Sequence, residues 1–95
     1  MHVGIIGCGQ LARMLALAGW HMGLRFSFLA DERESTGCVD GLGAVVRWSG
    51  EEAPGEIFQA LGKPDVVTVE RELVDADLLA GLAEFCRVYP GANAV

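Results

Sequence analysis

Short runs of apolar residues alternate along this chain with longer stretches in which apolar residues recur at every third or fourth position. The short runs cover residues 2–6, 25–29, 44–46, 65–69 and 88–89. Runs of this length, bounded by glycine or by polar turns, are typical of strands that are buried in a parallel sheet. The pattern therefore predicts a parallel sheet of four to five strands.

Three stretches between these runs have the spacing of amphipathic helices. The first covers residues 10–22, and the apolar residues expected to face the core are Leu11, Met14, Leu15, Ala18 and Met22. The second covers residues 51–61, with Pro54 in its first turn and an apolar face of Ile57, Phe58 and Leu61. The third covers residues 75–86, with Asp75 as the N-cap and an apolar face of Leu78, Leu79, Leu82 and Phe85.

The alternation of strands and helices predicts an α/β domain of the Rossmann-like type, because right-handed crossovers between such strands make the sheet parallel. Sheets of this kind bind ligands beyond the carboxyl ends of their strands. A chain of 95 residues forms one domain and buries only roughly 60–65% of its unfolded surface. At 52% hydrophobic residues, it is more apolar than a small domain needs, which is consistent with surface meant for a partner or a further domain.

The formal net charge of −6 argues against nucleic acid or an anionic membrane as a partner, because both select for clustered Lys and Arg. No basic segment precedes the N-terminal apolar run, and Arg13 interrupts the longest apolar stretch. Neither export nor membrane spanning is therefore expected. We expect a cytoplasmic protein.

The sequence offers no set of residues for covalent or metal chemistry. The cysteines lie far apart, without the spacing of a zinc site or of a disulfide framework: they are Cys8, Cys38 and Cys86. His2 and His21 are isolated, and each is expected to be structural or solvated. We therefore predict no catalytic residue and no metal ligand in this chain.

A glycine-rich turn is the strongest local signal of a ligand site. The segment Gly-Cys-Gly-Gln-Leu-Ala at residues 7–12 matches the pattern G-x-G-x-x-G/A, directly after a predicted strand and at the start of a predicted helix. Glycine allows a close approach of backbone to ligand, and the first N–H groups of a helix attract an anion. The turn predicts a site for a phosphate-bearing ligand; the alternative is a turn that only packs the helix on the sheet.

Acidic residues follow two of the predicted strands. Asp31 follows the turn at about the distance at which a dinucleotide-binding domain places the acid that holds a ribose hydroxyl; the alternative is a solvated turn residue. Glu70 and Glu72 project to the same side if the extended backbone continues past residue 69. Carboxylates there accept hydrogen bonds from an amine or a sugar hydroxyl, or they form an ordinary solvated corner.

The sequences of three segments resemble those of one enzyme family. Residues 5–15, Ile-Ile-Gly-Cys-Gly-Gln-Leu-Ala-Arg-Met-Leu, closely resemble the opening IIGGGQLGRML of N5-carboxyaminoimidazole ribonucleotide synthases, the ATP-grasp ligases of purine synthesis. Residues 65–74 are similar to the family's DVVTxExExV, and residues 88–90 to its VYP. The resemblance thus spans nearly the whole chain. The departures are Cys8 and Ala12 in place of glycines, Arg71 in place of an apolar residue and Asp75 in place of proline.

This resemblance implies that residues 1–95 are a single N-terminal, substrate-side domain, and that the ATP-grasp domains lie outside the chain. In the family this domain binds no dinucleotide and helps to hold aminoimidazole ribonucleotide. The substrate-binding residues that the resemblance implies are Gly9, Gln10, Leu11, Glu70 and Glu72. It also implies ATP and Mg²⁺ bound outside this chain, a homodimeric full-length enzyme, and a reaction in which bicarbonate carboxylates the substrate amine at the expense of ATP.

Under this interpretation, the isolated chain is expected to be inactive. Three alternative interpretations remain open. One is the formate-dependent glycinamide ribonucleotide transformylase, whose similar turn carries Glu in place of Gln10. Another is an NAD(P)-dependent oxidoreductase that uses Asp31. The last is an interaction module without enzymatic activity.

Overall fold

The computed structural model describes residues 1–70 and 75–89. Within these residues, five parallel strands form one sheet in the order β3-β2-β1-β4-β5. The strands are β1 His2–Ile6, β2 Arg25–Asp31, β3 Ala44–Trp48, β4 Val66–Val69 and β5 Arg87–Tyr89. The predicted Rossmann-like α/β fold is confirmed, and each predicted strand is present within two residues of its expected bounds.

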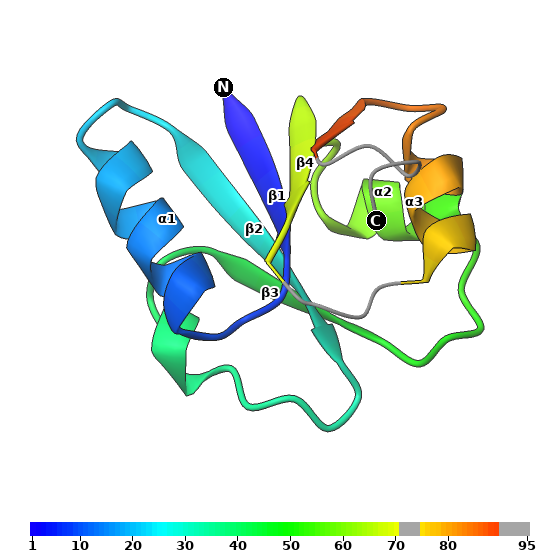
Figure 1. Ribbon diagram of the computed structural model, residues 1–95, viewed down its shortest axis with the longest axis horizontal. Helices are drawn as coiled ribbons and strands as arrows, with labels where there is room; N and C mark the ends of the chain where they lie inside the picture. The colour runs from blue at the N-terminus through cyan, green and yellow to red at the C-terminus, as the bar shows by residue number, and fades with distance from the viewer. Residues whose placement is uncertain (71–74, 90–95) are drawn as a thin grey trace.

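Helices cover the two faces of the sheet (Figure 1). On one face lie the α-helix α1 Gln10–Trp20 and the short 3₁₀ helix η1 Gly37–Val39; on the other lie α2 Pro54–Ala60 and α3 Ala76–Leu82. The three α-helices were predicted, but η1 was not. It lies in the segment between β2 and β3 that the sequence indicated as a loop.

The ends of two helices differ from their predicted positions. α2 begins at Pro54 rather than at residue 51, and the carboxylate of Glu52 instead accepts a hydrogen bond from the N–H of Ser49 at 3.2 Å. α3 begins as predicted, because Oδ1 of Asp75 accepts a hydrogen bond from the N–H of Asp77 at 2.9 Å. It ends at Leu82, four residues early, where bonds between residues three apart tighten the last turn before β5.

The predicted core face of α1 is wrong. Its buried residues are Ala12, Ala16 and Gly19, whereas the large apolar residues expected to face the core are exposed: Leu11, Met14, Leu15 and Met22. The reason is the short distance between this helix and the sheet. A Cβ atom on Gly19 would overlap the ring of Phe26, so only small residues fit against β2.

The core consists of two layers, one on each face of the sheet. The predicted faces of α2 and α3 are confirmed in the second layer, which contains Ile57, Leu61, Leu78, Leu79 and Leu82. Phe85 is the exception, since it is 51% exposed. It stacks on Phe58 with ring centroids 5.2 Å apart, at the edge of this layer.

The order of the strands makes the carboxyl ends of β1 and β4 the point at which the chain connections diverge. The connection from β1 leads to β2 on one side, whereas β4 pairs with β1 on its other side. Ligands of open α/β sheets bind at such a point of divergence. The glycine turn follows β1 and Glu70 follows β4, so both lie at this point of divergence.

Candidate functional site

The glycine turn connects β1 to α1 through backbone contacts. Gly7 has a φ of 128°, a conformation that favours glycine, and its N–H donates to the carbonyl of Leu29 at 2.9 Å. Gly9 is the N-cap residue of α1, and its carbonyl accepts from the N–H of Arg13 at 3.1 Å. The turn is thereby fixed to β2 on one side and to the helix on the other.

Cys8 places its side chain in the core and its N–H toward the loop after β2. The side chain is fully buried in the layer under α1 and does not project toward a ligand. The backbone N–H donates to Oε2 of Glu34 at 2.8 Å. A carboxylate of the protein therefore occupies the donor that a phosphate would use at this residue.

Glu34 joins the turn after β1 to the loop after β2. Its other carboxylate oxygen, Oε1, accepts a hydrogen bond from the N–H of Asp31 at 3.0 Å. Arg47 of β3 fixes the same loop, because its Nη1 donates to the carbonyls of Asp31 and Glu34, each at 2.9 Å, and of Glu32 at 3.2 Å. Backbone N–H groups after β1 and at the end of β2 thus bind the carboxylate of Glu34, and Arg47 of β3 holds the loop that carries this residue.

Glu70 is the acidic residue that the structure brings to the turn. Its N–H donates to the carbonyl of Ile6 at 3.0 Å, which continues the pairing of β4 with β1. A Cβ atom on Gly9 would lie 3.0 Å from Oε1 of Glu70, so the half-buried carboxylate lies directly over the turn. Glu72, the other acid predicted here, lies outside the described residues.

The remaining predicted site residues lie beside Glu70 and are open to a ligand. Gln10 is exposed at the first position of α1, and Leu11 follows it with 52% of its surface exposed. The first N–H groups of a helix have no partner within the helix. The carboxyl end of the sheet at β1 and β4 therefore combines these donors at Gln10 and Leu11 with carboxylate acceptors at Glu70 and Glu34.

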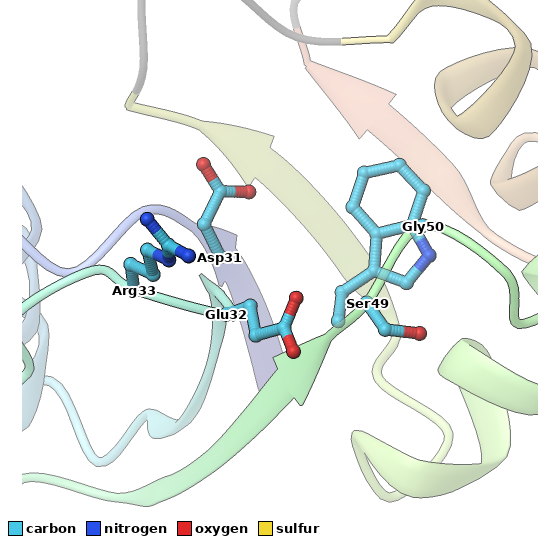
Figure 2. A pocket seen from close by; sticks show the side chains of 6 residues that line it. Asp31, Glu32, Arg33, Ser49 and Gly50 are labelled. Atoms are coloured by element: carbon cyan, nitrogen blue, oxygen red, sulfur yellow. The ribbon is translucent and has the colours of Figure 1, made fainter.

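Asp31 lines a separate pocket beyond the ends of β2 and β3. This pocket, about 340 Å³ in volume, has Asp31, Glu32 and Arg33 on one wall and Ser49 and Gly50 on the other (Figure 2). Its position resembles the one predicted for the ribose of a dinucleotide. The pyrophosphate of such a ligand would have to displace Glu34 from the N–H of Cys8, which disfavours this alternative.

The contact between Glu34 and Cys8 predicts a stability effect. In Glu34→Gln the side-chain amide can accept only one of the two N–H hydrogen bonds, so we expect a loss of about 1–2 kcal/mol. For a domain of this size, that lowers the melting temperature by roughly 5–10 °C, as thermal unfolding followed by circular dichroism would measure. Glu32→Gln, in the same loop and exposed, is the matched control and should melt within about 2 °C of the unmodified chain; equal melting of the two variants contradicts the role assigned to Glu34.

Neither a metal-binding cluster nor a membrane-spanning helix is present among the described residues. Residues 1–70 and 75–89 contain no group of three His, Cys, Asp or Glu side chains that could hold a metal ion. In the same ranges, no helix has the length and apolar character needed to cross a membrane. His2, which was expected to be structural or solvated, has its Nε2 3.0 Å from the buried Oγ of Ser27.

Comparison with known proteins identifies similar domains. Residues 1–95 match the family described as ribonucleotide synthetase preATP-grasp domain. The N5-carboxyaminoimidazole ribonucleotide synthase of Pseudomonas aeruginosa is 40% identical over all of this chain, and that of Vibrio cholerae is 35% identical. The chain spans 26% and 23% of the length of these two relatives.

Solved structures agree with this similarity. The N5-carboxyaminoimidazole ribonucleotide synthetase of Thermus thermophilus has a TM-score of 0.81 and 35% identity, over 97% of this chain and 25% of that protein. The synthase of Aspergillus clavatus, solved in complex with ADP and 5-aminoimidazole ribonucleotide, has a TM-score of 0.74 and 28% identity, over 98% of this chain and 24% of that protein. A transformylase from Mycobacterium tuberculosis reaches a TM-score of 0.81 at 21% identity, over 99% of this chain and 27% of that protein, which shows a shared fold alone.

Proposed function

Since the chain belongs to the ribonucleotide synthetase preATP-grasp domain family, we propose that it is the N-terminal, substrate-side domain of an N5-carboxyaminoimidazole ribonucleotide synthase. The proposed ligase carboxylates the amine of aminoimidazole ribonucleotide with bicarbonate and uses ATP to drive the step. Both curated relatives carry this name, and both are about four times as long as this chain. The ATP-grasp domains of the proposed enzyme lie outside residues 1–95.

One observation carries the substrate assignment: the glycine turn lies between two carboxylates. Glu34 accepts the N–H of Cys8 at 2.8 Å, and Oε1 of Glu70 lies over Gly9. Two acidic side chains at this point repel any phosphate group, but they accept hydrogen bonds from amines and hydroxyls. The acidic surroundings therefore favour the donor groups of aminoimidazole ribonucleotide at this point, its amine and ribose hydroxyls, with its phosphate directed away from the two carboxylates.

Each proposed site residue has a distinct role. Glu70 accepts a hydrogen bond from the amine or from a ribose hydroxyl of the substrate. Gly9 permits a close approach, since it has no side chain between the turn and Glu70. The backbone N–H groups of Gln10 and Leu11 donate to oxygen atoms of the substrate, and we assign Glu72 to the same site.

The other parts of the proposal concern the whole enzyme. Structures of similar enzymes contain ADP, and we propose that ATP and Mg²⁺ bind to the domains outside this chain. We also propose a homodimeric, cytoplasmic enzyme. Residues of this chain position the substrate and take no part in ATP cleavage.

Calorimetric titration of the 95-residue chain tests the proposed ligand. We expect aminoimidazole ribonucleotide to release heat on binding, NADH to give no change in fluorescence, and ATP to remain uncleaved. Binding of NADH without binding of aminoimidazole ribonucleotide would instead support the oxidoreductase alternative and the pocket at Asp31. A glycinamide ribonucleotide titration in parallel separates the transformylase alternative.

A further inference from the structure

α1 is apolar on nearly every side. Among its eleven residues Arg13 alone is charged, and the side packed on the sheet consists of small residues: Ala12, Ala16 and Gly19. A helix that is apolar all round is normally buried on all sides. α1 therefore carries more apolar surface than the described residues cover.

Exposed apolar residues of α1 occur on two sides of the helix, and Leu17 and Trp20 lie on the side that carries Arg13. Nη1 of Arg13 donates to the carbonyl of Cys38 at 3.1 Å, so the side that carries Arg13 faces η1. The opposite side, named the α1 flank, consists of residues at helical spacing: Leu11, Met14, Leu15 and Ala18. None of these residues is charged. All four are exposed, and Met14 reaches 63%. Since η1 lies toward β3, the flank faces toward β4 and β5.

No helix among residues 1–70 and 75–89 covers β4 and β5 on this face of the sheet. Ile5 packs in the layer under α1, and its neighbours across the sheet are Thr68 and then Tyr89. Arg87 pairs with Val66, which packs against the same layer. Both β5 residues are exposed, Tyr89 to 53%. The α1 flank and this part of the sheet thus form one corner that residues 1–70 and 75–89 leave uncovered, named the uncovered corner, whereas α2 and α3 lie on the opposite face (Figure 1).

We infer that this corner is the docking site for a helix from the polypeptide that follows β5 in the longer protein. The inference rests on the proposed function, because the remaining domains of the ligase supply that polypeptide. The two curated relatives carry about three-quarters of their length outside the part that this chain spans. A chain that leaves β5 at Tyr89 starts at the edge of the uncovered corner, whereas α2 and α3 already lie on the other face.

The chemistry of the corner defines the docking helix. Met14 and Leu15 require apolar side chains opposite them, because burial of exposed apolar surface drives such packing. Arg87 is exposed at the β5 end of the corner, where a carboxylate or an amide of the docking helix can accept its hydrogen bonds. The occupant is therefore an amphipathic helix of the same polypeptide, with such an acceptor at one end of its apolar side.

Rates of thiol labelling test this inference. We would introduce Ala18→Cys into the 95-residue chain and into the complete product of its gene, with other accessible cysteines changed to serine. In this chain those are Cys38 and Cys86; burial and the negative charge of Asp65 already raise the pKa of the Cys86 thiol. Ala60→Cys, exposed at the end of α2, is the matched control. We expect labelling with a maleimide at residue 18 to slow by about tenfold or more in the complete product, and labelling at residue 60 to stay within about twofold.

Three outcomes would overturn the inference. One is an unchanged labelling rate at residue 18 in the complete product, and another is equal slowing at both residues. The third is slowing in the 95-residue chain that depends on its concentration, because a second copy then covers the corner. If aminoimidazole ribonucleotide binds while residue 18 stays reactive, the docking inference fails and the proposed function stands. If residue 18 is protected but the ligand does not bind, the proposed function fails and the docking of a helix stands.

Discussion

Gly43→Ala will lower the melting temperature of this domain by about 10–20 °C, which corresponds to about 3 kcal/mol of lost stability. Gly43 directly precedes β3, at the point where the chain meets β2. A Cβ atom there would overlap the carbonyl oxygen of Phe26 and would lie 2.9 Å from its carbonyl carbon. Because these atoms belong to the backbone of β2, no rotamer change relieves the overlap, and β3 must move away from its partner.

Gly37→Ala is the matched control for this experiment. Its Cβ atom would meet only Oγ of Ser35, at 3.9 Å, and its φ lies outside the left-handed region. Replacing glycine at such a position restricts the unfolded chain and should raise stability by about 0.4–1 kcal/mol. Thermal unfolding of both variants by circular dichroism gives the comparison. If Gly43→Ala and Gly37→Ala have the same melting temperature, β2 and β3 do not approach each other as closely as the structure describes.

The strands could be predicted from the sequence because each is an apolar run with clear stops. β1 is buried from Val3 to Ile6 and consists there of apolar residues and glycine, and the buried centre of β2 contains one polar side chain, Ser27. Asp75 was recognised as a helix start for a similarly local reason, since an N-cap needs only its own side chain and the next turn. These features depend on residues that are close in sequence.

The inner face of α1 could not be predicted in this way. Periodicity selects the side with the largest apolar residues, whereas the distance between this helix and Phe26 selects the side with the smallest. That distance is a property of the folded domain. The large apolar residues on the outer side indicate a surface that another part of the protein covers. They do not indicate the side of the helix that packs on the sheet.

Half of the candidate site was predictable by topology. The ends of parallel strands meet at one edge, so the turn after β1 and Glu70 after β4 were expected to lie together. Glu34 was missed, because its contact with Cys8 joins residues 26 apart and depends on a loop that Arg47 holds. An acid soon after the second strand was visible, but the pattern directed attention to Asp31 instead.

Glu70→Gln will weaken the binding of aminoimidazole ribonucleotide by about 10- to 100-fold, the loss expected for one hydrogen bond to a charged acceptor, about 1.5–3 kcal/mol. The amide keeps the shape of the side chain and removes its charge. The melting temperature of Glu70→Gln should differ by less than about 3 °C from that of the unmodified chain, because the carboxylate is half-buried and lies over a residue without a side chain. Calorimetric titration with both proteins measures the change.

The design of this titration also identifies which donor Glu70 binds. Glu84→Gln, at an exposed acid after α3, is the matched control and should bind as the unmodified chain does. Titration of Glu70→Gln with ribose 5-phosphate separates two cases, since that ligand keeps the sugar hydroxyls and lacks the amine. A loss confined to aminoimidazole ribonucleotide assigns Glu70 to the amine, the atom that the proposed reaction carboxylates. Equal losses for both ligands assign it to the ribose, and unchanged binding of both would remove Glu70 from the site.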